Sequence, residues 1–550
     1  MRSVSSSADL VCLLMLKKPP IPPDLNEPIP LKRTIALIFG GLLALAGYIL
    51  LFPPAFNTND DPMMMAVVSG QLYGSSDAAL IFIHHWLGNA LIGLYRAAPW
   101  LNGYVAAMYV GLLSGIGTSS YFALRAGRYS GFALVVVGLA IYLSFLPLLL
   151  QPQYTNVAFT LGLAGLTALS IPGKLPLARK LLFSGLLLLA SLLRHPAIWG
   201  LALLAGPMLL FQAWPSRQWE RLGWLVFILM AVGIIRLADN HYYRTQRRNP
   251  EVFSHQRDID ILVNGPHTQP DTTHAGEAAT LQLLKNWFWV DGVRMSPANL
   301  AQMAQDRYQT RSLAEGVAGM LIVFNSHKKT LLALLFLFVL AGNLKSPALG
   351  LLFLSLIGIC LALSTAARLP DRVFLPLLSA FAFLRLAFIP LRPWASKPVS
   401  SLLIVLILLL QGLDIRAAIR ENQQLRTDHQ SAQAWVNAHP AGKIVVRGSA
   451  FPYEGGLSLY NHSPEAVGKL FPAGWLLGAP AYEAYRNRYW QGRDIWQQIC
   501  AQGLICIDPP VIALSRYACI YYDVSLAFDP IAAPIRKGKK SIPVYWVCAE

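Results

Sequence analysis

Long uncharged apolar runs recur along this chain, and they constrain its fold more than any other feature. The first extends from Thr34 to Phe56 and is long enough to cross a bilayer, which takes about 20 residues of helix. Similar runs follow through most of the first 415 residues. Only 13% of the 550 residues are charged, whereas a soluble domain has about 25%. The sequence therefore predicts a polytopic α-helical membrane protein.

The distribution of Lys and Arg orients the spans, because cytoplasmic loops retain positive charge. Lys32 and Arg33 precede the first run, which puts the N-terminus in the cytoplasm. Most later basic clusters then also face inward, and we expect about eleven transmembrane helices. The predicted spans are 34–56, 103–124, 130–150, 154–172, 181–193, 197–213, 222–238, 330–343, 347–366, 373–391 and 399–413.

Residues 79–98 are apolar enough to be considered as a further span. They also hold polar and aromatic side chains among the apolar ones, which is typical of a helix that lies in the membrane interface. A span here would invert every later loop and place most basic clusters outside. We therefore predict an interfacial helix on the outer face.

This topology divides the chain into three parts. Residues 1–30 are rich in proline and form a cytoplasmic leader. Residues 31–415 form the transmembrane domain, with long outer loops at 57–102 and 239–329. Residues 416–550 are predicted to form a small mixed α/β domain outside the membrane, because short apolar runs there alternate with Gly and Pro.

The outer parts hold further predicted elements. The aromatic patch at 286–291 favours another interfacial helix, since Trp prefers the headgroup level. The apolar runs of the tail are 444–446, 511–514, 520–522 and 544–547. Four of the six cysteines lie in this tail with no zinc spacing. One or two disulfides are expected if the tail faces an oxidising compartment; otherwise these are small buried side chains.

The chain is strongly basic, with a net charge of +17 and a pI near 9.6. It has no nucleic-acid-binding motif and no basic stripe interleaved with aromatic residues, so nucleic acid is excluded as a partner. Cytoplasmic Lys and Arg, with attraction to anionic membrane lipids or phosphate-bearing substrates, account for the charge.

Two adjacent carboxylates, Asp60 and Asp61, directly follow the first span. Partial desolvation at a membrane boundary disfavours their charge, so a pair placed there points to a function. The alternative is a solvated turn, because Asn-Asp-Asp-Pro is good turn chemistry and Asp also caps a following helix. On the predicted topology the pair faces outward, and a catalytic carboxylate is the favoured interpretation.

A few basic residues break the positive-inside pattern and gather on the same outer face. Arginine binds phosphate bidentately, and a carboxylate can take a proton from an attacking hydroxyl. The candidates for binding substrate or phosphate are Arg194, His195, Arg257, Arg368 and Arg372. Alternatively, Arg194 only anchors a helix end, and Arg368 and Arg372 pair with Asp371. Metal binding by both His84 and His85 is disfavoured, since adjacent helical residues point to different faces.

These features resemble the GT-C-type membrane glycosyltransferases, which use polyprenyl-phosphate-linked sugars. The resemblance covers the membrane part, up to about residue 415, and the tail matches no known pattern. It is carried by Thr58-Asn59-Asp60-Asp61 with Ser69-Gly70, by Gln153-Tyr154-Thr155-Asn156, by Leu193-Arg194, and by Arg372-Val373-Phe374-Leu375-Pro376.

The resemblance implies inverting transfer of a hexosyl or pentosyl group from a polyprenyl-phosphate carrier. The acceptor would be a glycan, lipid or protein on the outer face. One of Asp60 or Asp61 would be the general base, and Arg194, Arg368 and Arg372 would hold the phosphate. Some members use a divalent cation such as Mg²⁺ or Mn²⁺, so metal dependence stays open.

The resemblance also implies a place in the bacterial inner membrane and a role in cell-envelope polysaccharide biosynthesis. The N-terminus would be cytoplasmic and the C-terminal domain periplasmic. Two alternatives remain. A flippase or transporter of a lipid-linked saccharide would need ionisable residues near the middle of its spans. An O-antigen-type polysaccharide polymerase would need a catalytic arginine pair in place of an essential aspartate.

Overall fold

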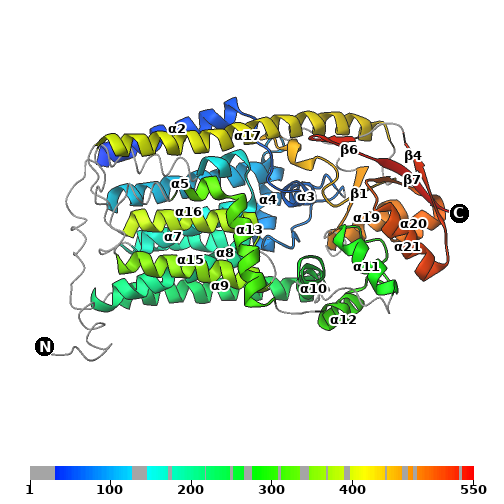
Figure 1. The fold of residues 1–550 in the computed structure, drawn as a ribbon, viewed down its shortest axis with the longest axis horizontal. Coiled ribbons are helices and arrows are strands. Elements are labelled where there is room, and N and C mark those ends of the chain that lie inside the picture. Colours follow the sequence, from blue (N-terminus) through cyan, green and yellow to red (C-terminus); the bar gives the residue numbers. More distant parts are fainter. Residues whose placement is uncertain are drawn as a thin grey trace.

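The computed structural model describes most of the chain in a single copy. The described residues are 31–72, 74–126, 145–170, 176–216, 219–247, 252–265, 275–307, 311–332, 334, 346–366, 369–388, 397–439, 443–460, 469–474, 480–531 and 535–550. The protein is mostly helical, with a small region of β-structure near its C-terminus. Figure 1 shows a bundle of long helices with an α/β domain at one end of it.

The long helices of the first 415 residues run side by side. They are α2 (Leu31–Leu51), α5 (Gly103–Ala126), α7 (Tyr154–Ser170), α8 (Leu177–Ser216), α9 (Trp219–Thr245), α15 (Pro347–Ala366), α16 (Asp371–Phe388) and the first half of α17 (Lys397–Asn437). Within the described residues, four stretches are long and apolar enough to cross a membrane: Gly103–Phe122, Leu177–Ala213, Leu222–Thr245 and Pro347–Ala366.

The chain is therefore a multi-pass membrane protein, as its apolar runs predict. Most of the runs at 130–150 and 330–343 lies outside the described residues. The total of about eleven spans stays a prediction.

Helix α8 is a hairpin of two antiparallel arms. The backbone is extended at Arg194 (φ −159°, ψ 89°). Pro196 favours a break here, because it has no N–H to continue the hydrogen bonds of the first arm and suits the first turn of the second. A straight helix of this length would separate its ends by about 60 Å. Instead, Lys180 near its start forms an ion pair with Glu220, just beyond its end. The predicted spans 181–193 and 197–213 are these two arms.

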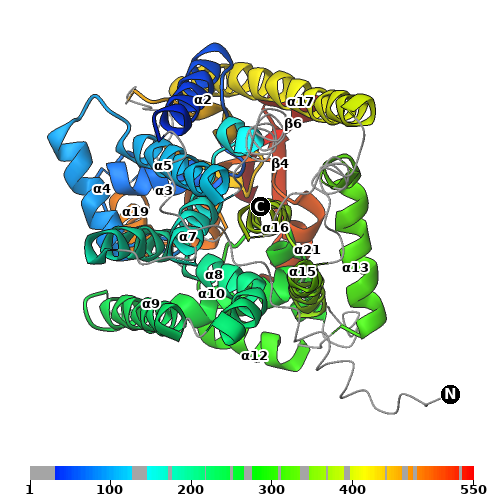
Figure 2. The ribbon, with the colours of Figure 1, turned by 90° about the vertical axis from the view of Figure 1, so that its left-hand side faces the viewer.

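Helix α16 lies in the middle of the bundle and is almost entirely buried (Figure 2). Helix α17 runs along one side and continues without a break past residue 415 into the C-terminal domain (Figure 1). At about 60 Å it is long enough to join the bundle to this domain.

Short helices fill the space between the bundle and the C-terminal domain. They are α3 (Asp60–Ser69), α4 (His85–Ala97), α10 (Val252–Asn264), α11 (Ala275–Lys285), α12 (Pro297–Arg307) and α13 (Leu313–Ser326). Of the predicted interfacial segment 79–98, only the 13 residues of α4 are helical. The helix starts late because the His84 side chain caps it by accepting a hydrogen bond from the Trp86 N–H.

The predicted interfacial helix at 286–291 is wrong. Helix α11 ends at Lys285, and Trp287 has a positive φ of 51°, which no helix continues through. Phe288 and Trp289 are buried at 0% and 2% exposure. The adjacent Val290 carbonyl accepts a hydrogen bond from the Trp496 N–H of the C-terminal domain. The patch is therefore a junction between the long loop and this domain.

The C-terminal domain contains a five-stranded mixed sheet in the order β2-β1-β3-β7-β4. Strand β1 (Ile444–Arg447) pairs in parallel with β2 (Leu470–Ala473) and β3 (Leu504–Ile507). Strand β7 (Val544–Ala549) is antiparallel to β3 and to β4 (Leu526–Pro530). The remaining elements are η1 (Tyr453–Gly456), α19 (Pro480–Trp490), α20 (Ile495–Gln502), α21 (Val511–Tyr522), β5 (Ile535–Lys537) and β6 (Lys540–Ile542).

This domain has the predicted mixed α/β character, although the apolar runs take different roles. Runs 444–446 and 544–547 are strands, whereas 511–514 and 520–522 both belong to α21. The buried residues of α21 are Ala513, Leu514, Tyr517 and Ala518, and a spacing of four is that of a helix. The five described cysteines, Cys360, Cys500, Cys506, Cys519 and Cys548, are all free, so the expected disulfides are not formed among them.

Candidate active site

A cavity of about 870 Å³ lies where the bundle meets the C-terminal domain. Its walls come from the first loop, α8, α9, α10, α15, α16 and the ends of β1 and β2. Five of the predicted site residues line it together, although they are distant in sequence: Asp60, Arg194, His195, Arg257 and Arg372. Asp61 lies behind this wall, and Arg368 lies outside the described residues.

Asp60 is the first residue of α3, and it faces Arg372 of α16 across the cavity wall. The Arg372 Nη1 donates to the Asp60 Oδ2 at 2.8 Å. The alternative pairing of Arg372 with Asp371 is wrong, because Asp371 instead contacts the His327 Nε2 at 2.9 Å. Because adjacent side chains on a helix point about 100° apart, Arg372 faces the cavity whereas Asp371 faces α13.

Asp61 is fully buried and serves the packing of the helices. Its Oδ1 accepts hydrogen bonds from the Tyr104 hydroxyl at 2.8 Å and from the Tyr154 N–H at 3.1 Å. The Tyr154 N–H belongs to the first turn of α7 and has no acceptor within its own helix, so it needs one from elsewhere. Burial raises the pKa of Asp61 to about 8, although the bonds from Tyr104 and Tyr154 oppose this rise. At neutral pH, Asp61 is therefore mainly a neutral carboxylic acid.

The two aspartates thus have different environments. Asp60 borders the cavity beside a guanidinium, whereas Asp61 fixes α3 against α5 and α7. We call Asp60, Asp61 and Arg372 the carboxylate cluster. The sequence left open which aspartate acts on a substrate, and this arrangement favours Asp60.

Arg194 lies at the turn of the α8 hairpin and projects into the same cavity. Its guanidinium packs over the rings of Phe82 and Tyr154 at 5.5 and 5.6 Å. Among the described residues it has no ion pair with a carboxylate, unlike Arg372. Its charge is therefore available to an anionic ligand, and Tyr154 holds it close to the carboxylate cluster.

Two residues that the sequence did not single out as site residues line the same wall. Arg236 and Asp239 lie near the end of α9, where Arg236 Nη1 and Asp239 Oδ2 are 3.4 Å apart. They lie within electrostatic range of His195. The signal for them is their spacing of three, which places them on one face of a helix at the end of a predicted span.

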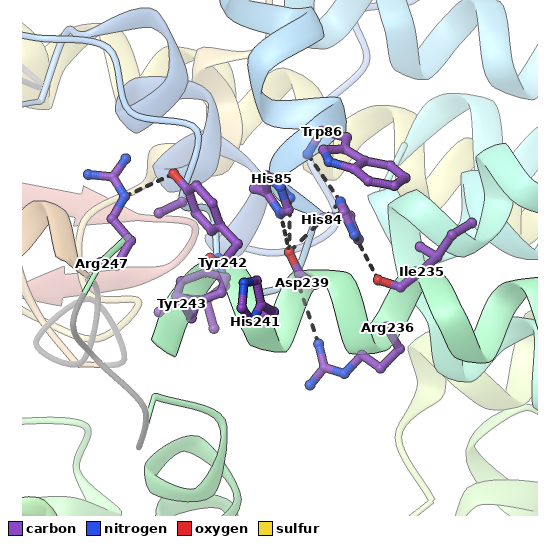
Figure 3. A network of polar contacts seen from close by, with 12 residues as sticks. His84, His85, Trp86, Ile235, Arg236, Asp239, His241, Tyr242, Tyr243 and Arg247 are labelled. Atoms are coloured by element: carbon purple, nitrogen blue, oxygen red, sulfur yellow. Dashed lines mark hydrogen bonds and ion pairs between the residues drawn. The ribbon is translucent and has the colours of Figure 1, made fainter. Parts of the chain in front are cut away.

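Asp239 also contacts two histidines of the first loop (Figure 3). Its Oδ1 lies 2.8 Å from the His85 Nδ1 and 3.8 Å from the His84 Nδ1. We call His84, His85 and Asp239 the histidine cluster. The two imidazoles stack at 4.5 Å, so the expectation that they point apart is wrong. It fails because His84 precedes α4 and does not follow helical geometry.

The carboxylate cluster does not fit a Mg²⁺ or Mn²⁺ ion. Such ions need several converging oxygen ligands. The Asp60 carboxylate is bound to Arg372, and the Asp61 Oδ1 is occupied by Tyr104 and Tyr154. With one oxygen of each carboxylate already bonded, the pair offers few free oxygens for a hard cation.

The C-terminal domain closes one side of the cavity. Gly448 and Ser449 follow β1, and Ala473 and Gly474 end β2, so the carboxyl ends of two parallel strands face the cavity. In α/β sheets this edge is the usual place for a ligand. Trp287 lines the cavity next to them, and a Cβ at Gly448 would come within 3.0 Å of the Trp287 Cβ.

The opposite side of the cavity reaches the surface of the bundle. Trp199 and Leu203 of α8 line it and are 40% and 62% exposed. Ile359 and Leu363 of α15 are their apolar neighbours in the lining. This side of the cavity lining is therefore apolar and partly exposed on the bundle.

Two solved structures are similar to this chain over most of its length. They are crystal structures of ArnT from Cupriavidus metallidurans, one in the apo state and one bound to undecaprenyl phosphate. The sequence identities are 15% and 13%, and the TM-scores are 0.40 and 0.37. Each comparison covers 93% of this chain, with 98% and 97% of the ArnT chains. No protein-family model and no curated protein matches the chain.

Proposed function

We propose that this protein is an inverting glycosyltransferase that moves a sugar from a polyprenyl-phosphate carrier to an acceptor hydroxyl on the outer face of the membrane. The observation that carries this proposal is the joint placement of Asp60, Arg372 and Arg194 on one cavity. That cavity is open to the lipid-facing surface beside Trp199 and Leu203. A substrate that joins a lipid tail, a phosphate and a sugar matches these three features.

In the proposed reaction, Asp60 accepts the proton of the acceptor hydroxyl. The hydroxyl oxygen bonds to the anomeric carbon of the sugar while the bond from that carbon to the phosphate oxygen breaks. Polyprenyl phosphate leaves with the bonding electrons, and the configuration at the carbon is inverted. Arg194 and Arg372 stabilise the negative charge that grows on the phosphate.

The ion pair with Arg372 also gives donor binding a role. While it is paired, the Asp60 Oδ2 is occupied by the Arg372 Nη1. A phosphate that binds Arg372 competes with Asp60 for the guanidinium. Donor binding then frees the carboxylate for the acceptor, which enters beside Trp287 and the ends of β1 and β2.

The transporter alternative receives less support from the cavity. Its described lining residues on the long helices all lie within about three turns of the end that faces the C-terminal domain. A carrier needs a path through the bundle, whereas an enzyme needs only one accessible end.

The test is transfer by the purified protein from polyprenyl-phosphate pentoses and hexoses, measured as release of polyprenyl phosphate. Asp60→Asn should slow transfer by about 10²- to 10⁴-fold, the usual effect of losing a general base. Asp61→Asn should retain most of the activity, because an amide oxygen can still accept from Tyr104 and Tyr154. Full activity of Asp60→Asn would contradict the proposal and favour the polymerase, which depends on arginines.

A further inference from the structure

The histidine cluster joins two segments that are far apart in sequence. His84 and His85 belong to the first loop, whereas Asp239 lies 154 residues after His85, near the end of α9. All three are buried, at 5%, 7% and 3% exposure. Their ligating atoms, two imidazole nitrogens and a carboxylate oxygen, lie within 4.8 Å of one another. Figure 3 shows the three side chains pointing toward one another.

The separations are close to those of a metal coordination sphere. Ligands of a tetrahedral Zn²⁺ ion lie about 3.3 Å apart, given bonds of about 2.0–2.1 Å. The Asp239 Oδ1 is 3.8 Å from the His84 Nδ1 and 2.8 Å from the His85 Nδ1. Shifts of about half an ångström bring both pairs to the required spacing.

The surroundings orient the histidines as metal ligands are oriented. The His84 Nε2 donates to the Ile235 carbonyl at 3.0 Å, so the Nδ1 of the neutral ring carries the lone pair. This Nδ1 accepts the Trp86 N–H at 3.1 Å, a bond that a metal ion would replace. A ligating histidine commonly donates its other N–H to a backbone carbonyl. The His85 ring is fixed by Tyr242, which stacks on it with 3.9 Å between the ring centroids and an angle of 3° between the ring planes.

The carboxylate retains an oxygen for a metal. Arg236 is its cationic neighbour, but their contact is long, at 3.4 Å. The Arg236 guanidinium instead packs over the Phe253 ring at 3.8 Å. The Oδ1 that faces both histidines accepts the His85 N–H at 3.2 Å and has no guanidinium contact among the described residues.

We propose that the histidine cluster binds a transition-metal ion of the Zn²⁺ class through the Nδ1 atoms of His84 and His85 and the carboxylate of Asp239. Two imidazoles select such an ion over Mg²⁺ or Mn²⁺. His84 and Asp239 line the cavity whereas His85 does not, so the fourth coordination position faces the cavity. The ion ties the first loop to α9 and is separate from the carboxylate cluster.

The test uses the full-length protein purified in detergent and stripped with a chelator. Addition of Zn²⁺ should restore about one bound ion per chain and raise the unfolding temperature by about 5 °C, whereas Mg²⁺ should not. Co²⁺ in the same site should give the visible absorption of a four-coordinate ion. Neither readout depends on catalytic activity, so failure of the proposed transferase reaction would leave this test intact.

Variants separate metal binding from simple packing. His85→Ala and Asp239→Asn should each lose the bound ion and the thermal response to Zn²⁺. His429→Ala is the matched control: His429 is a buried histidine of α17 that bonds only the Pro452 carbonyl among the described contacts, and its loss should leave both unchanged. The proposal is overturned if the wild type binds no Zn²⁺, or if the cluster variants respond to Zn²⁺ as the wild type does.

Discussion

The carboxylate cluster and the histidine cluster face the same cavity but differ in how their members are held. Asp60 has one strong partner, Arg372, and both border the cavity. The three members of the histidine cluster are buried and contact one another. A group bound by a single exchangeable partner can be redirected by a substrate, whereas a mutually bonded buried group holds two segments together. We therefore propose a chemical role for the carboxylate cluster and a structural role for the histidine cluster.

The largest effect on the rate of transfer after that of Asp60 is expected at Arg194, because it has no carboxylate partner among the described residues and lies near the carboxylate cluster. Arg194→Ala should slow transfer by about 10- to 100-fold, the loss expected for hydrogen bonds to a charged phosphate. Steady-state kinetics on the donor measures this effect. Arg257→Ala is the matched control, since its side chain lines the cavity but is 75% exposed, and it should change the rate by less than about threefold. Equal losses in both variants would contradict a specific phosphate site at Arg194.

The support role of the histidine cluster predicts a loss of stability larger than the loss of rate. Asp239→Asn removes the charge that faces His85 and Arg236, and breaking such a buried group costs about 3 kcal/mol or more. We expect a lower unfolding temperature with a rate within about tenfold of the wild type at permissive temperature. If the rate falls as far as in Asp60→Asn while the unfolding temperature is unchanged, the two clusters share the chemistry.

Substitutions on the apolar side of the cavity should have a smaller effect, on the KM for the lipid-linked donor. Trp199→Ala removes apolar surface from the path beside Leu203, so the KM for a long-chain donor should rise by about three- to tenfold. A donor with a short prenyl chain should show little change. Leu210→Ala, an exposed site further along the same helix that does not line the cavity, should leave both KM values unaltered. A uniform rise for both chain lengths would place the lipid elsewhere.

A pH-dependent effect on stability separates the two aspartates themselves. The folded-state pKa of Asp61 is raised to about 8 from 3.8, so the folded protein holds a proton that the unfolded chain has released between these values. Asp61 therefore makes stability fall as the pH rises from about 4 to 8, by up to about 1.4 kcal/mol per pH unit. Asp61→Asn should remove this contribution. The stability of the variant relative to the wild type should therefore be higher at pH 8 than at pH 5. Unfolding temperatures across this range measure it, and parallel curves would contradict a buried neutral Asp61.

Several elements could be predicted because local chemistry decides them. The α8 hairpin follows from Pro196 after Arg194-His195, and the short α4 keeps 79–98 from spanning the membrane. The aromatic patch at 286–291 could not be predicted, because its Trp and Phe residues look alike whether they meet lipid or another domain. Phe288 and Trp289 are buried beside the contact of Val290 with Trp496 of the C-terminal domain, and that contact depends on where this domain docks.

The sequence by itself determined the apolar helices and the placement of an acidic pair after the first of them, since length, charge and turn residues are local properties. It also singled out Arg194 and Arg372, whose joint position on the cavity only the tertiary structure decided. Adjacent residues on a helix point about 100° apart, so the packing of α3 against α5 and α7 alone turned Asp60 to the cavity and Asp61 to the interior. The same holds for His84 and His85, which meet Asp239 only because the first loop folds against the end of α9.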